Sequence, residues 1–74
     1  MTEVKISKKD TVIGKRIRKY RHKANLTQEA LAEKVRVSTT HVGLVETGKR
    51  RMSLKSLQKV ANALGIKVRD LIPF

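Results

Sequence analysis

The sequence predicts an all-α fold of five helices in one small domain. A chain of 74 residues is long enough for a single hydrophobic core. No segment alternates apolar and polar residues with the period of two that a half-buried strand requires. Hydroxyl-bearing residues begin three segments with helical apolar spacing, and glycine follows two of these segments. These observations favour helices and argue against a sheet.

Residues 1–10 are predicted to form a flexible basic tail ahead of a domain at residues 11–74. The alternative for this tail is an arm that lies along DNA. A first helix then begins at Asp10 or Thr11, with one basic face and one apolar stripe. The stripe consists of Ile13, Ile17, Tyr20 and Ala24, and Asn25 ends the helix.

Three further helices begin at hydroxyl N-caps, which are Thr27, Ser38 and Ser53. An apolar residue precedes each cap and another lies five positions on, the pattern of a hydrophobic staple. Gly48 and Gly65 suit the left-handed position beyond the third and fourth helices. A fifth short helix is predicted from Val68 to Ile72, stopped by Pro73 and begun after Lys67, where no hydroxyl is available for capping.

The second and third helices are predicted to form a helix-turn-helix at about residues 27–47. Only Arg36 and Val37 precede the Ser38 cap, and two short helices joined this closely must cross steeply. The small side chain of Ala32 permits close approach of the third helix. Val42 and Val45 form the inner face of that helix. Four residues are left facing outward: Thr39, Thr40, Gly43 and Leu44.

The charge indicates a polyanionic partner. The 18 Lys and Arg residues outnumber the 6 Asp and Glu residues, so the formal net charge is +12. Tyr20 and Phe74 are too few aromatic residues for a platform that stacks single-stranded bases. An outward helix on such a basic domain fits the major groove of double-stranded DNA.

Other function classes are disfavoured. The chain has no Cys, and its two His residues are not spaced as a zinc motif, so we expect no disulfide, metal or cofactor. No apolar run approaches the roughly 18 residues of a membrane span. Glu29 and Glu33 lie four apart, as paired catalytic acids can, but solvated neighbours of Lys34 are the favoured interpretation. We therefore expect no enzyme activity.

Five stretches of the chain occur in a familiar combination: Ile13-Gly14-Lys15-Arg16-Ile17-Arg18, Leu26-Thr27-Gln28-Glu29-Ala30-Leu31-Ala32, Val37-Ser38, Glu46-Thr47-Gly48-Lys49-Arg50 and Ala63-Leu64-Gly65-Ile66. With them, the stretch from Ile13 to Ile72 resembles the Cro/C1-type (Xre family) helix-turn-helix regulators. The resemblance implies a five-helix, lambda-repressor-like DNA-binding domain that acts as a homodimer on a two-fold symmetric operator. It further implies a bacterial or phage-type repressor or autoregulatory controller in the cytoplasm, at the nucleoid.

The resemblance also assigns residues to the DNA. Thr39, Thr40 and Leu44 match base-contacting positions, and their methyl groups predict some preference for A·T pairs. The alternatives are helix capping for Thr39 and a surface apolar residue for Leu44. Gln28 matches a position that holds a phosphate from the first turn of its helix. Arg21 is expected to pair with Glu46, partly buried, and so to orient the groove helix.

Further DNA contacts are predicted around the third helix. Gly48 fixes a loop beside the groove, so phosphate contacts are expected from Lys49, Arg50 and Arg51, with a solvated charge run as the alternative. Ser38 and His41 complete the predicted phosphate contacts, and a plain helix-surface role is equally open for His41. Gly43 is assigned to close backbone approach to a base pair. Arg36 stands where the family often has Gly, which implies strain at a positive φ, a different turn or an added phosphate contact.

The dimer interface is predicted at the C-terminal apolar residues Ile66, Val68, Leu71 and Phe74. The alternative is that these residues, with Ile72, close the core of the domain. Two other functions stay open for the chain as a whole. One is an antitoxin-type interaction module with a protein partner, and the other is non-specific DNA binding.

Overall fold

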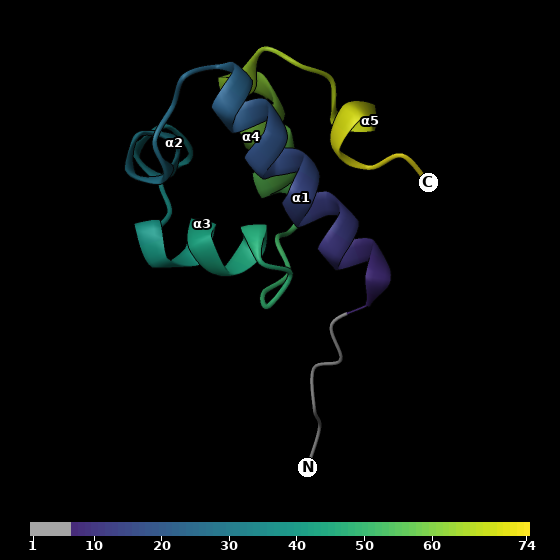
Figure 1. Cartoon of the computed structure of the whole chain (residues 1–74). Helices are drawn as coiled ribbons and strands as arrows, with labels where there is room; N and C mark the ends of the chain where they lie inside the picture. Colours follow the sequence, from purple (N-terminus) through teal and green to yellow (C-terminus); the bar gives the residue numbers. More distant parts are fainter. Residues whose placement is uncertain (1–6) are drawn as a thin grey trace.

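A computed structural model describes residues 7–74, whose regular structure is five helices (Figure 1). The helices are α1 Lys8–Lys23, α2 Gln28–Val35, α3 Thr39–Glu46, α4 Leu54–Leu64 and α5 Val68–Leu71. Residues 7–74 contain no strand. The predicted all-α fold of five helices is therefore confirmed.

Helix α1 begins at Lys8, earlier than the sequence predicted, because Ser7 and Asp10 form a capping box that we overlooked. The Ser7 hydroxyl accepts from the Asp10 N–H at 3.4 Å, and the Asp10 carboxylate accepts from the Ser7 N–H at 3.0 Å. Lys8, Lys9 and Asp10 thus belong to the helix rather than to a tail. The remainder of the predicted tail, residues 1–6, lies outside the described residues.

The other predicted helix starts are confirmed. The hydroxyls of Thr27, Ser38 and Ser53 accept hydrogen bonds of 3.0, 3.0 and 3.2 Å from the N–H three residues on. Lys67 makes no side-chain cap, and the Asp70 carboxylate instead accepts from the Lys67 N–H at 3.0 Å. Each short helix is therefore begun by a local hydrogen bond.

Residues in the left-handed conformation follow the ends of several helices. Gly48 and Gly65 have φ of 75° and 68° after α3 and α4, as predicted. Asn25, with φ of 57°, turns the chain after α1. Ala24 was placed on the apolar stripe of the first helix, but this was wrong, because Ala24 follows the last helical residue and is exposed.

The core lies where all five helices meet. Its most deeply buried side chains are Ile17, Leu31, Val42, Val60 and Leu71. The prediction of Leu71 as an interface residue is wrong, because its side chain is 0% exposed and cannot contact a second protomer. Arg16 ties α5 to α1, since its Nη1 donates to the Asp70 carbonyl at 3.0 Å. The fifth helix therefore closes the core, the alternative left open by the sequence.

Helix α1 approaches α3 closely at Gly14. A Cβ at this position would meet the Val45 carbonyl oxygen and would lie 2.9 Å from the Glu46 carbonyl oxygen. Both oxygens belong to the last turn of α3. The absence of a side chain at Gly14 therefore sets how α3 rests on α1.

Candidate nucleic-acid interface

The candidate interface is the outer side of α3. This side faces away from the other described helices and lies at one edge of the molecule (Figure 1). Val42, Val45 and Glu46 are buried against the domain. The outward residues of α3 are Thr39, Thr40, Gly43 and Leu44, of which the two threonines are exposed and the other two partly exposed. The structure thus places the four predicted base-contacting residues on one surface.

Thr47 belongs to the same surface, although the sequence analysis did not select it. It follows the last residue of α3 and is exposed. Its hydroxyl donates to the carbonyl oxygens of Gly43 at 3.2 Å and Leu44 at 3.1 Å. The methyl group of Thr47 and the lone pairs of its hydroxyl oxygen are left for contacts. Continuing the helical spacing Thr40, Leu44, Thr47 would have identified it.

A buried ion pair holds α3 to α1. Arg21 Nε lies 2.6 Å from Glu46 Oε2, and Arg21 Nη2 donates to Glu46 Oε1 at 3.0 Å, so the contact is bidentate. The remaining Arg21 nitrogen, Nη1, donates to the Leu26 carbonyl at 2.8 Å. No buried side-chain polar atom in residues 7–74 lacks a partner. Arg21 compensates a carboxylate at the C-terminal end of α3, where the helix dipole disfavours negative charge.

Gln28 extends this network from α2. Its Nε2 donates to Glu46 Oε1 at 3.1 Å. Its side chain also lies across Gly43, where an added Cβ would be 3.6 Å from Gln28 Oε1, an ordinary contact distance. Gln28 therefore joins the first turn of α2 to α3 at the edge of the candidate interface. The predicted phosphate contact of Gln28 stays a prediction.

The loop after α3 carries the next predicted phosphate contacts. Lys49, Arg50 and Arg51 are exposed, and Arg51 Nη2 lies 3.3 Å from Asp10 Oδ2. A Cβ at Gly48 would lie 2.8 Å from Thr11 Oγ1, so the loop packs tightly on the start of α1. The hydrogen bond from the Ser7 backbone N–H lowers the pKa of Asp10. Partial burial opposes this effect, and Ser7 Oγ and Arg51 add to it. Asp10 is therefore a charged anchor for this loop.

The remaining predicted contacts lie at the turn and at the start of α3. Arg36 has the left-handed φ of 59° and is exposed, so the strained turn is the one present. The Ser38 hydroxyl is engaged in capping, and His41 is partly buried. Their contacts with phosphate stay predictions.

The large exposed apolar side chains lie at the C-terminus and at the start of α4. Phe74 is 57% exposed, and Lys9 Nζ lies 5.4 Å from the centre of its ring. Ile66 and Val68 are partly exposed. Leu54, at the start of α4, is 58% exposed and was not among the residues predicted for the interface.

The acidic residues of α2 do not form a cluster with a third metal-binding side chain in residues 7–74. Glu29 and Glu33 are both exposed on α2. No group of three His, Cys, Asp or Glu residues that could hold a metal ion occurs in residues 7–74. Within the same residues, no helix has both the length and the apolar character of a membrane span.

Comparison with known proteins gives a family. A family model described as helix-turn-helix (HTH_3) matches residues 17–71. The chain is 34% identical over 64 residues to the control protein C.BamHI of Bacillus amyloliquefaciens, covering 85% of this chain and 79% of that protein. It is 38% identical over 60 residues to the immunity repressor protein of Bacillus phage phi105, covering 81% of this chain and 42% of the repressor.

Two solved structures are similar over most of the chain. The restriction-modification controller protein C.AhdI from Aeromonas hydrophila superposes with a TM-score of 0.83 at 37% identity, covering 88% of this chain and 98% of that one. The biofilm master regulator SinR, solved in complex with DNA, superposes with a TM-score of 0.75 at 32% identity, covering 80% and 95%.

Proposed function

The chain belongs to the helix-turn-helix family of Cro/C1-type DNA-binding transcription regulators, and from this premise we propose that it reads a two-fold symmetric operator as a homodimer. The observation that carries the proposal is the α3 surface. The outer side of α3 is uncovered, and the helix is held by a buried ion pair in a chain of net charge +12. Such a helix fits a major groove about 12 Å wide.

Sequence reading is assigned to the outward side chains of α3. Thr39 and Thr40 carry hydroxyls that donate to or accept from base edges. Leu44, partly exposed one turn on, offers an apolar side chain, and Thr47 offers its methyl group. Apolar groups pack on the methyl group of thymine, so the preferred half-site contains A·T pairs under α3.

Affinity is assigned to cations and amides around α3. Gln28 with the first N–H groups of α2, and Lys49, Arg50 and Arg51 in the loop after α3, contact phosphates on the two sides of the groove. Ser38 and His41 lie at the start of α3 and add to this set. If roughly 6–8 phosphates are neutralised per dimer, the log–log dependence of affinity on salt has a slope of about −5 to −7.

The homodimer is assigned to the exposed C-terminal apolar residues. Ile66, Val68 and Phe74 keep exposed surface, whereas Leu71 does not. Two α3 helices in one dimer would reach half-sites about one helical turn, or roughly 34 Å, apart. Replacing Phe74 by alanine therefore weakens self-association without unfolding the domain. Sedimentation velocity measures the proportions of monomer and dimer.

The names of the relatives support a proposed biological role. C.BamHI is named a control protein, C.AhdI a restriction-modification controller and the phage relative an immunity repressor. We assign this chain to the same kind of task, autoregulatory control or repression of nearby genes. Such a regulator works where the chromosome is, in the bacterial cytoplasm.

The test is a binding-site selection on random duplex DNA at about 150 mM salt. A two-fold symmetric motif with A·T pairs in each half-site supports the proposal. The variant Thr40→Ala/Leu44→Ala provides the control, since both residues are outside the core and the variant selects a different motif with an unchanged melting temperature. Enrichment of no sequence would overturn the proposal in favour of non-specific binding.

A further inference from the structure

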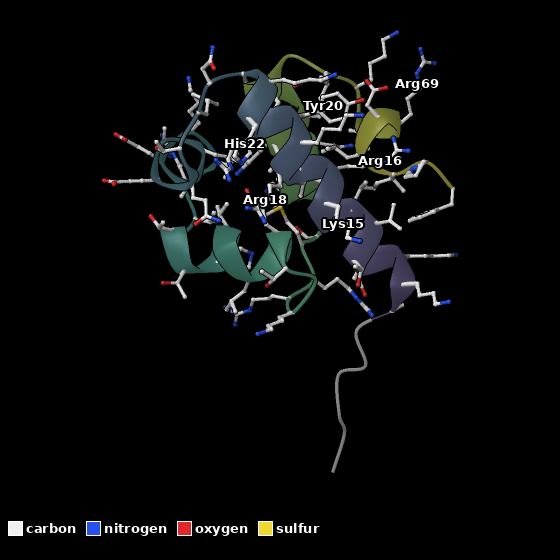
Figure 2. The ribbon with its side chains drawn as sticks, in the orientation of Figure 1. Lys15, Arg16, Arg18, Tyr20, His22 and Arg69 are labelled. Atoms are coloured by element: carbon white, nitrogen blue, oxygen red, sulfur yellow. The ribbon has the colours of Figure 1, made fainter. Side chains whose placement is uncertain are left out.

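Helix α1 carries a row of basic side chains on the side that faces α3. The row is Lys15, Arg18 and His22, spaced three and four residues apart and so on one face of the helix. Figure 2 shows Arg18 and His22 above α3 and Lys15 beyond its end, whereas Tyr20 and Arg16 lie on the opposite side of α1, toward α5. We call Lys15, Arg18 and His22 the basic row.

The basic row is not neutralised by the protein. Lys15 and Arg18 are exposed and form no ion pair within residues 7–74. The acid on α1, Asp10, is held by Ser7 and Arg51 at the far end of the helix. Glu46, the acid of α3 that contacts α1, is bound by Arg21 and Gln28. The positive potential of the row is therefore directed to the solvent.

The basic row continues the surface on which Gln28 lies. His22 Nε2 is 3.2 Å from Arg21 Nη2, which also contacts Glu46, and Glu46 in turn accepts from Gln28. A guanidinium only donates, so Nε2 of His22 is the acceptor in this contact and the other ring nitrogen is the one left to contact a phosphate. The row and the first turn of α2 therefore form one surface beside α3.

The depth of the groove brings phosphates to the height of α1. An α-helix with its side chains is about 10–12 Å across, whereas the major groove is about 8.5 Å deep. When α3 fills the groove, the phosphates at its rim reach the level of the helices that pack over α3. Helix α1 is one of these, with Gly14 in contact with the end of α3. From Lys15 to His22 the row is about 10 Å long, the axial rise of about three phosphates of one strand.

We propose that Lys15, Arg18 and His22 bind the phosphodiester backbone of the operator strand that passes the first turn of α2. This inference rests on the proposed function and adds a contact surface that the helix-turn-helix itself does not supply. The row contributes affinity and salt dependence but reads no sequence, because phosphates carry no base information. The bound strand belongs to the same duplex as the groove that holds α3.

The test compares two variants that lose the same charge from the same helix. Lys15→Gln/Arg18→Gln removes two cations of the row. Lys19→Gln/Lys23→Gln is the matched control, because the Nζ of each lysine lies 5.6 Å from the centre of the Tyr20 ring. Figure 2 shows the side chain of Tyr20 on the other side of α1 from the row. Equal melting curves by circular dichroism establish that all three proteins are folded.

Fluorescence anisotropy then measures affinity for the selected operator and for a random duplex between about 0.1 and 0.4 M salt. Each lost phosphate contact reduces the slope by about 0.9, so the row variant loses about 1.8 per protomer, or about 3.6 per dimer. Its affinity at about 0.15 M salt falls at least roughly tenfold for both duplexes, and their ratio is unchanged. The control changes the slope by less than about 1.

Three results would overturn the inference. The row variant and the control could show the same slope, or the row variant could lose discrimination between the duplexes rather than affinity for both. Sedimentation could also show that each wild-type dimer binds a second duplex, and that the row variant no longer binds it whereas the control still does. Failure of the wild-type protein to select any operator is a different outcome, which refutes the proposed function itself.

Discussion

Replacing Gly14 by alanine is expected to destabilise the domain, although the same change stabilises most helix positions. In an unobstructed helix, alanine is favoured over glycine by roughly 0.5–1 kcal/mol. At Gly14 the new Cβ would meet the Val45 carbonyl oxygen and would lie 2.9 Å from the Glu46 carbonyl oxygen. These atoms are backbone and cannot rotate away, so α1 and α3 must separate.

Overpacking costs about 1–3 kcal/mol, and a clash with backbone atoms belongs to the upper part of this range, about 2–3 kcal/mol. Subtracting a helix gain of up to about 1 kcal/mol leaves a net loss of unfolding free energy of roughly 1–2 kcal/mol. For a domain of this size, such a loss lowers the melting temperature by roughly 5–15 °C. Operator affinity falls as well, because the displaced helix is α3. Urea and thermal unfolding followed by circular dichroism measure the stability of the variant.

Gly43→Ala is the matched control, since it makes the same change in another helix. An added Cβ at Gly43 lies 3.6 Å from Gln28 Oε1, an ordinary contact. The control is therefore expected to gain up to about 1 kcal/mol. If Gly14→Ala were as stable as the wild type, or if both variants shifted in the same direction, the inference that Gly14 sets the α1–α3 contact would be refuted.

Three further predictions follow from single contacts. Glu46→Ala leaves the buried Arg21 unpaired and should lower the free energy of unfolding by about 3–5 kcal/mol. Glu46→Gln keeps hydrogen-bonding atoms and should lower it by less. Equal melting curves for the wild type and both variants would contradict this expectation. Arg36→Gly removes a left-handed non-glycine residue and should raise the melting temperature by a few degrees, while Arg36→Ala should not; a gain from both would exclude backbone strain as the cause. Asp10→Ala removes the capping box and should cost about 1 kcal/mol at neutral pH. Because the pKa of Asp10 is lowered in the folded state, this contribution to stability is present above about pH 4 and is lost as the pH falls through the folded-state pKa. Melting temperatures of wild type and variant, measured between pH 7 and pH 2, should therefore converge in acid. A difference in melting temperature that stays constant with pH would argue against a role for the charge of Asp10.

The helices could be predicted because their signals are local. The hydroxyls of Thr27, Ser38 and Ser53 bond to N–H groups three residues away, and Gly48 and Gly65 adopt the φ that their position after a helix requires. The one start placed too late, that of α1, also had a local signal. The Ser7–Asp10 pair is a weaker signal in the sequence, because Asp stands where the pattern more often has Glu or Gln.

The site was predictable in part. The outward position of Thr39 and Thr40 follows from the helical period once Val42 and Val45 are placed inside. The pairing of Arg21 with Glu46 came from the family resemblance, since the two residues are 25 positions apart and no periodicity joins them. The same holds for the contact of Gln28 with Glu46, which is made between two helices.

The sequence by itself determined where the helices begin and end and which side of each is apolar, because caps, left-handed glycines and the period of 3.6 act within a few residues. Only the tertiary structure decided which apolar residues are enclosed, so that Leu71 is buried while Leu54 and Phe74 are exposed. It also decided that Gly14 is a point of helix contact and that the basic row of α1 lies on the α3 side. These features depend on how helices distant in sequence pack together, and burial and electrostatic potential are properties of that packing.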